Sequence, residues 1–376
     1  MNTRIYLDHA ASTPLHPEVI DIMQKVAIQY YGNPSSIHRE GAQAKSIVEE
    51  CRKKIASFIH TSPGQIIFTS CGTESNNAYL SSVIGSDLIR TVISSPIEHP
   101  AVLNTLKFHC KRHHVELKLL NPDQNGLINI DQLEDQLRKS GQNTLVTLMH
   151  TQNELGTVLP LRDFSLICKH YGAKFHSDTI QSVGIEALDV TDLQIHAITG
   201  SGHKFNGPKG VGFLYIKEPS QLNPLIFGGN QERNMRGGTE NTIGIAGMTK
   251  ALELAFNEQQ ERRQHLNRLK SKFLDGLQLS GINFEINSPL VDCSPKILNI
   301  DFDKTVKSDW LLMNLDIEGI AVSGGSACSS GTEKASHVLE YIRPTSEGRS
   351  VRFSFSYMNT EDEIDHTLYV LSRLLS

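Results

Sequence analysis

Long apolar runs and an excess of positive charge are both missing from this sequence of 376 residues. No stretch approaches the roughly 18 uninterrupted apolar residues of a membrane span, and the opening MNTRIYLDHAAS lacks the apolar segment of a secretory signal. The formal net charge of -5 argues against a surface that binds nucleic acid or membrane. We therefore predict a cytoplasmic protein with no membrane partner and no direct nucleic-acid partner.

Paired cysteines are also missing. The chain has six cysteines and no CxxC pair, which is typical of reduced thiols in a cytosolic enzyme: Cys51, Cys71, Cys110, Cys168, Cys293 and Cys328. Cys110 lies close to His113 and His114, but no second ligand pair of suitable spacing follows. We therefore expect a polar segment before a strand there, and no metal site.

One of these thiols has unusual surroundings. Cys328 lies in VSGGSACSSGTE, residues 322–333, where its neighbours are serine, glycine and alanine. Cysteine is often buried, yet no residue within four positions could pack around this one. The thiol either has no function or is a reactive group, and the other motifs of the chain are needed to distinguish the two.

Strand-like runs such as QIIFTS and AKFHSD alternate with amphipathic stretches from about residue 15 to 255. This alternation predicts an α/β fold with a mainly parallel central sheet and helices on both faces, in which ligands bind at the carboxyl ends of the strands. A long charged helix at 244–279 would then lead to a smaller α+β domain. We predict a large domain at 15–255 and a small domain formed by 1–14 and 256–376.

A possible phosphate site lies in FTSCGTESNN, which joins a predicted strand to a predicted helix. Thr73 is predicted to cap the helix, and Gly72 to permit a tight turn. Free N–H groups at a helix N-terminus bind phosphate well. For this motif alone, an ordinary capped helix is the favoured interpretation.

A carboxylate follows the apolar strand in AKFHSDTIQSVG, where Asp178 precedes Gln181 by three residues. In isolation Asp178 could simply cap a helix. A buried aspartate would, however, be the natural partner for a ligand with a protonated ring nitrogen.

A lysine follows a further strand in TGSGHKFNGPKG. Lys204 has Ser201 and His203 beside it, and Lys209 is a weaker candidate. A loop lysine is usually only solvated, but in a partly desolvated, cation-rich pocket it becomes a nucleophilic amine. A phosphate-binding helix start, an aspartate for a ring nitrogen and a Schiff-base lysine together meet the requirements of pyridoxal 5'-phosphate.

At this point the chain resembles a known family, the fold-type I, class V aminotransferase-like cysteine desulfurases of the NifS/IscS type. The resemblance runs nearly end to end, through IYLDHAASTPLHPEV, YGNPSSIHREG, FTSCGTESNN, IEHPAVL, HTQNELGTV, FHSDTIQSVG, SGHKFNGPKGVGFLYI, RGGTENT, GSACSSG and VRFSFS. It implies the PLP-dependent transferase fold, with the mobile cysteine loop at about 322–333 on the small domain.

The resemblance also implies roles for the residues around the cofactor. Lys204 would form the Schiff base, Asp178 would pair with the ring nitrogen, Gln181 would donate to the phenolic oxygen, and His99 would stack on the ring and shuttle protons. The remaining cofactor residues would surround the phosphate: Gly72, Thr73, Ser201, His203 and, from the neighbouring subunit of a homodimer, Thr239.

Two further residues resemble those expected near the substrate. Arg352 would bind the substrate carboxylate through a bidentate pair of hydrogen bonds, and Asn153 would lie close by and also contact the cofactor. The alternative for Arg352 is a strand-edge arginine in a surface ion pair.

The resemblance gives Cys328 a function. It implies removal of sulfur from L-cysteine to give L-alanine and a persulfide on Cys328, for transfer to an acceptor or scaffold protein in iron–sulfur cluster assembly or other sulfur trafficking. A thiol that collects and delivers sulfur needs an uncrowded loop, which serine and glycine supply. Cys71 beside the phosphate loop is predicted to be structural, and the chain is expected to lack the C-terminal extension that docks a scaffold in some members.

Two alternatives remain open at this point. A selenocysteine lyase or a β-eliminating lyase on the same fold would use Lys204 equally and need Cys328 less. A non-catalytic homologue could serve as a binding platform in a sulfur-handling complex, which cofactor binding without turnover of L-cysteine would indicate.

Overall fold

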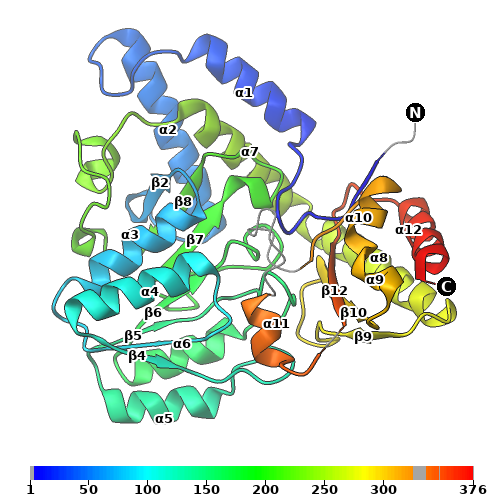
Figure 1. Cartoon of the computed structure of the whole chain (residues 1–376). Helices are drawn as coiled ribbons and strands as arrows, with labels where there is room; N and C mark the ends of the chain where they lie inside the picture. Colours follow the sequence, from blue (N-terminus) through cyan, green and yellow to red (C-terminus); the bar gives the residue numbers. More distant parts are fainter. Residues whose placement is uncertain (1–3, 325–335, 347, 376) are drawn as a thin grey trace.

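A seven-stranded sheet forms the centre of the molecule (Figure 1). The computed structural model describes residues 4–324, 336–346 and 348–375. The strands run in the order β2 (Ile66–Thr69), β8 (Gly212–Ile216), β7 (Ala197–Ser201), β6 (Lys174–Asp178), β5 (Thr144–Thr147), β3 (Thr91–Ser94) and β4 (Glu116–Leu119). β8 is antiparallel to both of its neighbours, and the other pairs are parallel. The predicted mainly parallel sheet is confirmed.

Helices cover both faces of this sheet because neighbouring residues of each strand point to opposite sides. In β2, Ile66 and Phe68 enter one apolar core and Ile67 enters the other. The first core packs against α1 (Pro17–Gln29), α2 (Arg39–Phe58), α5 (Ile130–Ser140), α6 (Leu161–His170) and α7 (Thr242–Asn257). The second packs against α3 (Gly72–Ile84) and α4 (Pro100–His113). We call β2–β8 with α1–α7 the large-sheet region.

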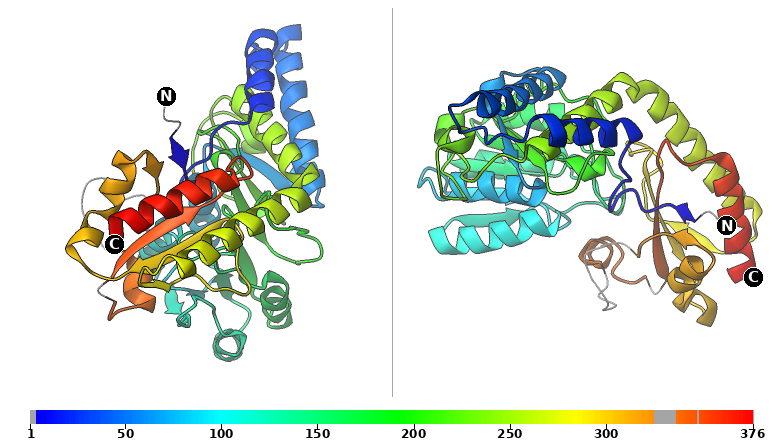
Figure 2. Two further views of the ribbon diagram at one scale, coloured as in Figure 1. Left: turned by 90° about the vertical axis from the view of Figure 1, so that its right-hand side faces the viewer. Right: turned by 90° about the horizontal axis from the view of Figure 1, so that it is seen from above.

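A third apolar core lies beside the large-sheet region and is built on an antiparallel sheet (Figures 1 and 2). Its strands run in the order β12 (Arg349–Ser354), β10 (Ile297–Phe302) and β9 (Phe284–Ile286). The remaining elements are β1 (Ile5–Tyr6), β11 (Ile320–Ala321), α8 (Gln259–Leu279), α9 (Val306–Asp309), α10 (Leu311–Ile317), α11 (His337–Ile342) and α12 (Glu361–Leu375). We call β1, β9–β12 and α8–α12 the small-sheet region. The domain boundaries proposed from the sequence stay a prediction.

The connection between the two regions differs from the expected single helix at 244–279, and that expectation is wrong. α7 ends at Asn257 and α8 begins at Gln259, because Glu258 adopts φ -106 and ψ 10, outside the α-helical range. α7 buries residues such as Leu252 in the large-sheet region, whereas α8 buries residues such as Leu269 in the small-sheet region. The break lets each helix face its own core.

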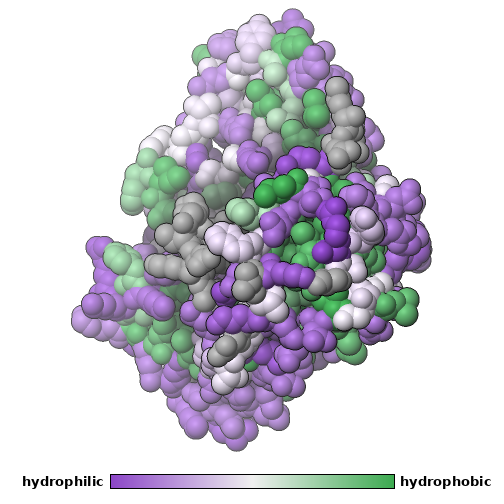
Figure 3. All heavy atoms as spheres, turned by 45° about the vertical axis from the view of Figure 1, so that its right-hand side comes forward, coloured by the Kyte–Doolittle hydropathy of each residue, from purple (hydrophilic) through white to green (hydrophobic). Residues whose placement is uncertain are grey.

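On the face drawn in Figure 3, hydrophilic side chains predominate and apolar ones form separate patches. Among the helices that the structure describes, none is both long enough and apolar enough to cross a bilayer.

Candidate active site

A cavity of about 370 Å³ opens at the carboxyl ends of the parallel strands, a size typical of small-molecule sites. Ten of its lining residues were predicted as site residues from the sequence: Gly72, Thr73, His99, Asn153, Asp178, Gln181, Ser201, His203, Lys204 and Arg352. Cys71, which was predicted to be structural, also lines the cavity. Thr239 is exposed and lies outside this cavity, on the wall of a separate one beside Arg236. Cys328 lies outside the described residues.

Lys204 lies where the chain turns after β7, in the short 3-10 helix Gly202–Lys204. Its Nζ donates to the main-chain oxygens of Ala10 at 2.7 Å and Ala11 at 3.0 Å. Gln181 donates from Nε2 to the same Ala10 oxygen at 2.8 Å. The N-terminal segment therefore meets the reactive lysine, a contact between residues almost 200 positions apart.

Asp178 ends β6 and is buried. Its Oδ2 accepts a hydrogen bond from Asn76 Nδ2 at 2.8 Å, and its Oδ1 accepts one from the Ile180 amide at 3.0 Å. These donors satisfy a carboxylate that would be costly to bury alone. The sequence analysis missed Asn76, which lies in the middle of α3 and carries no signal of its own.

His99 caps α4, because its Nδ1 accepts the Ala101 amide at 3.0 Å. Burial lowers the pKa of His99, while the charge of Asp178 opposes that shift. With Nδ1 as an acceptor, a neutral ring carries its proton on Nε2. His99 therefore caps a helix and also lines the cavity as a neutral imidazole.

The predicted cap at the start of α3 is wrong. The N-cap residue is Cys71, no side chain caps the helix, and Thr73 is the second residue of the first turn. Gly72 lies against the Ile180 side chain and has no positive φ: a Cβ there would lie 2.1 Å from Ile180 Cδ1, so the Ile180 side chain would have to move. The first N–H groups of the helix stay available to a ligand.

Polar atoms beside this helix start fit an anion. Ser201 Oγ is buried with no hydrogen-bond partner. His203 Nδ1 lies 3.4 Å from Ser12 Oγ, and burial together with the charges of Lys204, Lys296 and Lys209 lowers the pKa of His203 to about 4. An unpaired buried hydroxyl next to free helix N–H groups is the environment that a phosphate would complete.

Arg352 is buried in β12, with 2% of its surface exposed, so the surface ion pair considered from the sequence is wrong. Its Nη2 lies 3.0 Å from Asp8 Oδ1, and its Nη1 donates to the main-chain oxygen of Asn153 at 2.9 Å. Its Nε has no partner. Only the tertiary structure identifies Asp8 as a partner of this guanidinium.

Metal ligands do not gather in the part of the chain that the structure describes: no group of three or more His, Cys, Asp or Glu side chains is placed to hold an ion. Cys110 is buried in α4, and burial raises the pKa of its thiol to about 11. Cys71 is a partly buried free thiol on the cavity wall.

Comparison with known proteins defines the class and then the family. The model of the family described as Aminotransferase class-V matches residues 5–367. The cysteine desulfurase IscS of Dictyoglomus turgidum is 40% identical over 379 residues, which cover 100% of this chain and 95% of that protein. A solved NifS-like protein is 34% identical with a TM-score of 0.91 and 99% of each chain covered. A second solved structure, SspA in complex with cysteine, is 32% identical with a TM-score of 0.81, covering 95% of this chain and 100% of that one.

The chain therefore belongs to the class-V aminotransferase family and, within it, to the cysteine desulfurases of the IscS/NifS type. This family depends on pyridoxal 5'-phosphate. The resemblance and the fold class predicted from the sequence are confirmed.

Proposed function

We propose that the protein removes sulfur from L-cysteine, releases L-alanine and leaves a persulfide on Cys328. The observation that supports this most strongly is the grouping of Lys204, Asp178 and Arg352 on one cavity. An amine, a buried carboxylate and a buried guanidinium suit a cofactor aldehyde, a ring nitrogen and an amino-acid carboxylate respectively.

The residues present fit pyridoxal 5'-phosphate. Lys204 would hold it through Nζ, Asp178 at the ring nitrogen, Gln181 at the phenolic oxygen and His99 on the ring face. The phosphate would be held by Gly72, Thr73, Ser201 and His203, and the unpaired Ser201 Oγ supports this. When bound, the cofactor supplies an electron sink for negative charge at the substrate Cα.

The substrate would be held by Arg352, with Asn153 beside it. Because Asp8 contacts Nη2 of Arg352, a substrate carboxylate has to share that guanidinium or displace Asp8. Lys204 would then take the Cα proton on Nζ, and the neutral His99 would move a proton through Nε2.

Cys328 would act as the sulfur carrier. Its thiolate attacks the substrate sulfur, a sulfur–sulfur bond forms and the carbon–sulfur bond breaks. The electron pair of the broken bond stays with carbon, which takes up a proton as alanine is released. The persulfide then passes to an acceptor or scaffold protein, for iron–sulfur cluster assembly or other sulfur trafficking in the cytoplasm.

We propose further that the enzyme is a homodimer in which Thr239 reaches the phosphate of the neighbouring subunit. The exposure of Thr239, away from the cavity of its own chain, supports this arrangement.

The test is to incubate the purified holoenzyme with L-cysteine without reductant and to map added sulfur by mass spectrometry. We expect one additional sulfur on Cys328, its loss in Cys328→Ser, and its retention in the matched Cys71→Ser variant. Alanine release that continues in Cys328→Ser would instead favour a lyase. Bound cofactor with neither alanine nor persulfide would favour a non-catalytic platform.

A further inference from the structure

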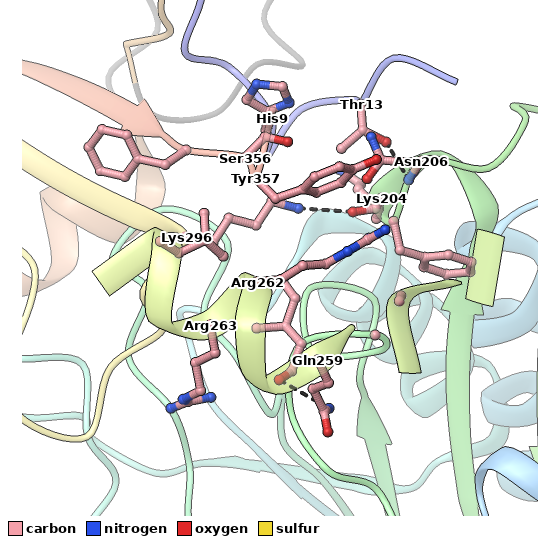
Figure 4. A pocket seen from close by; sticks show the side chains of 16 residues that line it. His9, Thr13, Lys204, Asn206, Gln259, Arg262, Arg263, Lys296, Ser356 and Tyr357 are labelled. Atoms are coloured by element: carbon pink, nitrogen blue, oxygen red, sulfur yellow. Dashed lines mark hydrogen bonds between the residues drawn. The ribbon is translucent and has the colours of Figure 1, made fainter. Parts of the chain in front are cut away.

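Lys296 is a buried lysine that the proposed reaction does not use. It immediately precedes β10 and is 3% exposed. Its Nζ donates to the main-chain oxygen of Lys204 at 2.9 Å, so one lysine holds the backbone of the other (Figure 4). The bond crosses from the small-sheet region to the large-sheet region, at the residue that would carry the cofactor.

The surroundings of Lys296 make this bond costly to lose. The side chain borders a small cavity of about 40 Å³, which holds only a few water molecules. His9, Arg262 and Tyr357 line the same space (Figure 4). Without the Lys204 oxygen, a buried amine would have little water to replace it.

Two cations and one anion face Lys296: Lys204 in the turn after β7, Arg352 in β12 and Asp8 in the N-terminal segment. His203 and His9 also lie near it, but burial lowers their pKa values to about 4 and about 3, so both rings are neutral near pH 7. Asp8 is the only anion in this group. Burial and the charges of Lys204 and Arg352 lower the pKa of Lys296 to about 7, and Asp8 opposes the shift.

The main chain of Lys296 is tied to the strand that carries Arg352. The Phe355 amide donates to the Lys296 oxygen at 2.8 Å, and Ile297 pairs with Ser354 at the end of β12. The β10–β12 pair therefore presents one cation to the substrate position and a second to the backbone of Lys204. A shift of this pair moves both contacts together.

We infer that Lys296 is a positioning residue for Lys204: its Nζ fixes the Lys204 main chain and, when protonated, adds a positive charge near Lys204. This inference rests on the proposed role of Lys204 as the cofactor-binding lysine. A fixed main chain keeps the amine in a reactive geometry, where small displacements lower rates strongly. Below about pH 7, where Lys296 is protonated, its charge also favours the neutral Lys204 amine, which is the form that binds the cofactor and accepts a proton.

The test compares Lys296→Met, which removes donor and charge, with Lys296→Arg, which keeps both. The matched control is Lys270→Met, because Lys270 is also a buried lysine of the small-sheet region but donates to Ser294 and Cys293 and not to Lys204. The first readout is acetylation of Lys204 in the cofactor-free protein, followed by mass spectrometry from pH 6 to 10. The second is the pH midpoint of the visible absorbance of bound pyridoxal 5'-phosphate.

In Lys296→Met we expect both pH midpoints to rise by about one unit. At pH values below the midpoint, acetylation of Lys204 should therefore be about tenfold slower. Lys296→Arg and Lys270→Met should match the wild type. Unchanged midpoints in a folded Lys296→Met protein would overturn the inference. If Lys296→Met does not fold, Lys296→Gln removes the same charge, and unchanged midpoints there overturn it equally.

Neither readout needs turnover of L-cysteine. A shifted midpoint in a protein that forms no persulfide would uphold the positioning role and refute the desulfurase. Persulfide formation with unshifted midpoints would uphold the desulfurase and overturn the positioning role of Lys296.

Discussion

The two walls of the active-site cavity are built in different ways. The large-sheet region contributes short runs of neighbouring residues that begin at the last residue of a strand, such as Asp178 to Gln181 from the end of β6 and Ser201 to Lys204 from the end of β7. The small-sheet region contributes single buried cations, Arg352 and Lys296, each held by a partner from another part of the chain. Parallel strand ends deliver many groups to one edge at once, whereas a cation inside an antiparallel sheet needs a dedicated partner.

The largest effect should come from the large-sheet wall. Lys204→Ala removes the amine that binds the cofactor and moves the proton, so alanine formation should fall by at least about 10²- to 10⁴-fold. The matched control is Lys209→Ala, an exposed lysine five residues on, which should leave the rate within about twofold. Steady-state alanine release measures both, and similar losses in the two variants would contradict the assignment.

The small-sheet wall should respond through substrate affinity. Arg352→Lys keeps the charge but loses the planar fork, so KM for L-cysteine should rise and kcat/KM should fall by about 100-fold. Arg349→Lys on the same strand alters an exposed pair with Asp309 and should change kcat/KM by less than about twofold. An Arg352→Lys enzyme with unchanged KM would place the carboxylate elsewhere.

The close fit at the phosphate end can be tested by adding one methyl group. Gly72→Ala would place Cβ against Ile180, which should lower the free energy of unfolding by about 1–3 kcal/mol and weaken cofactor binding. Ile180→Ala in the same chain should restore most of both. In Gly64→Ala the nearest atom lies 3.4 Å away, so urea unfolding should show little change. No recovery in the double variant would argue against a steric cause.

The smallest effect concerns acid stability of the large-sheet core. Burial lowers the pKa of His176 to about 3, and its Nδ1 lies 2.8 Å from Thr147 Oγ1. The unfolded chain binds a proton near pH 6.5, so the unfolded state holds more protons between about pH 3 and 6.5 and stability falls as pH falls through that window.

From pH 6.5 to 5, this group should cost the wild type roughly 2 kcal/mol of unfolding free energy. Over the same interval, the unfolding free energy of His176→Asn should fall by roughly 2 kcal/mol less than that of the wild type. Urea unfolding at both pH values measures this difference. His366→Asn, at an exposed position of α12, should follow the wild type. If the unfolding free energy fell equally with pH in all three proteins, His176 would not be the acid-sensitive group.

Most of the large-sheet wall could be predicted from the sequence because its signals are local. A strand, a turn and a polar residue just past the strand end identify Asp178 and Lys204, and parallel strands bring such ends to one edge. The start of α3 was predicted wrongly: Thr73 was expected to cap the helix, but the N-cap residue is Cys71 and no side chain caps it. Nor could the sequence show that Ile180, from a loop about 100 residues away, packs against Gly72.

The N-terminal segment contributes residues to the site that could not be predicted from the sequence. Asp8, Ala10 and Ala11 stand in YLDHAAS, which carries no catalytic spacing, yet they contact Arg352 and Lys204. Their role depends on β1 pairing with β11 and on the turn at Asp8 that follows. Such pairings between distant segments leave no periodic pattern for a reader of the chain to detect.

The sequence by itself determined the alternation that builds the parallel sheet, the order of Thr73, Asp178 and Lys204, and the motifs that identify the family. Local propensity and strand-end geometry are sufficient for these. Only the tertiary structure decided that Arg352 is buried against Asp8, that Gly72 makes room for Ile180 and that Lys296 holds the backbone of Lys204. Each of these depends on which distant atoms share a dry interior, where a charge or a methyl group must find a partner or a space.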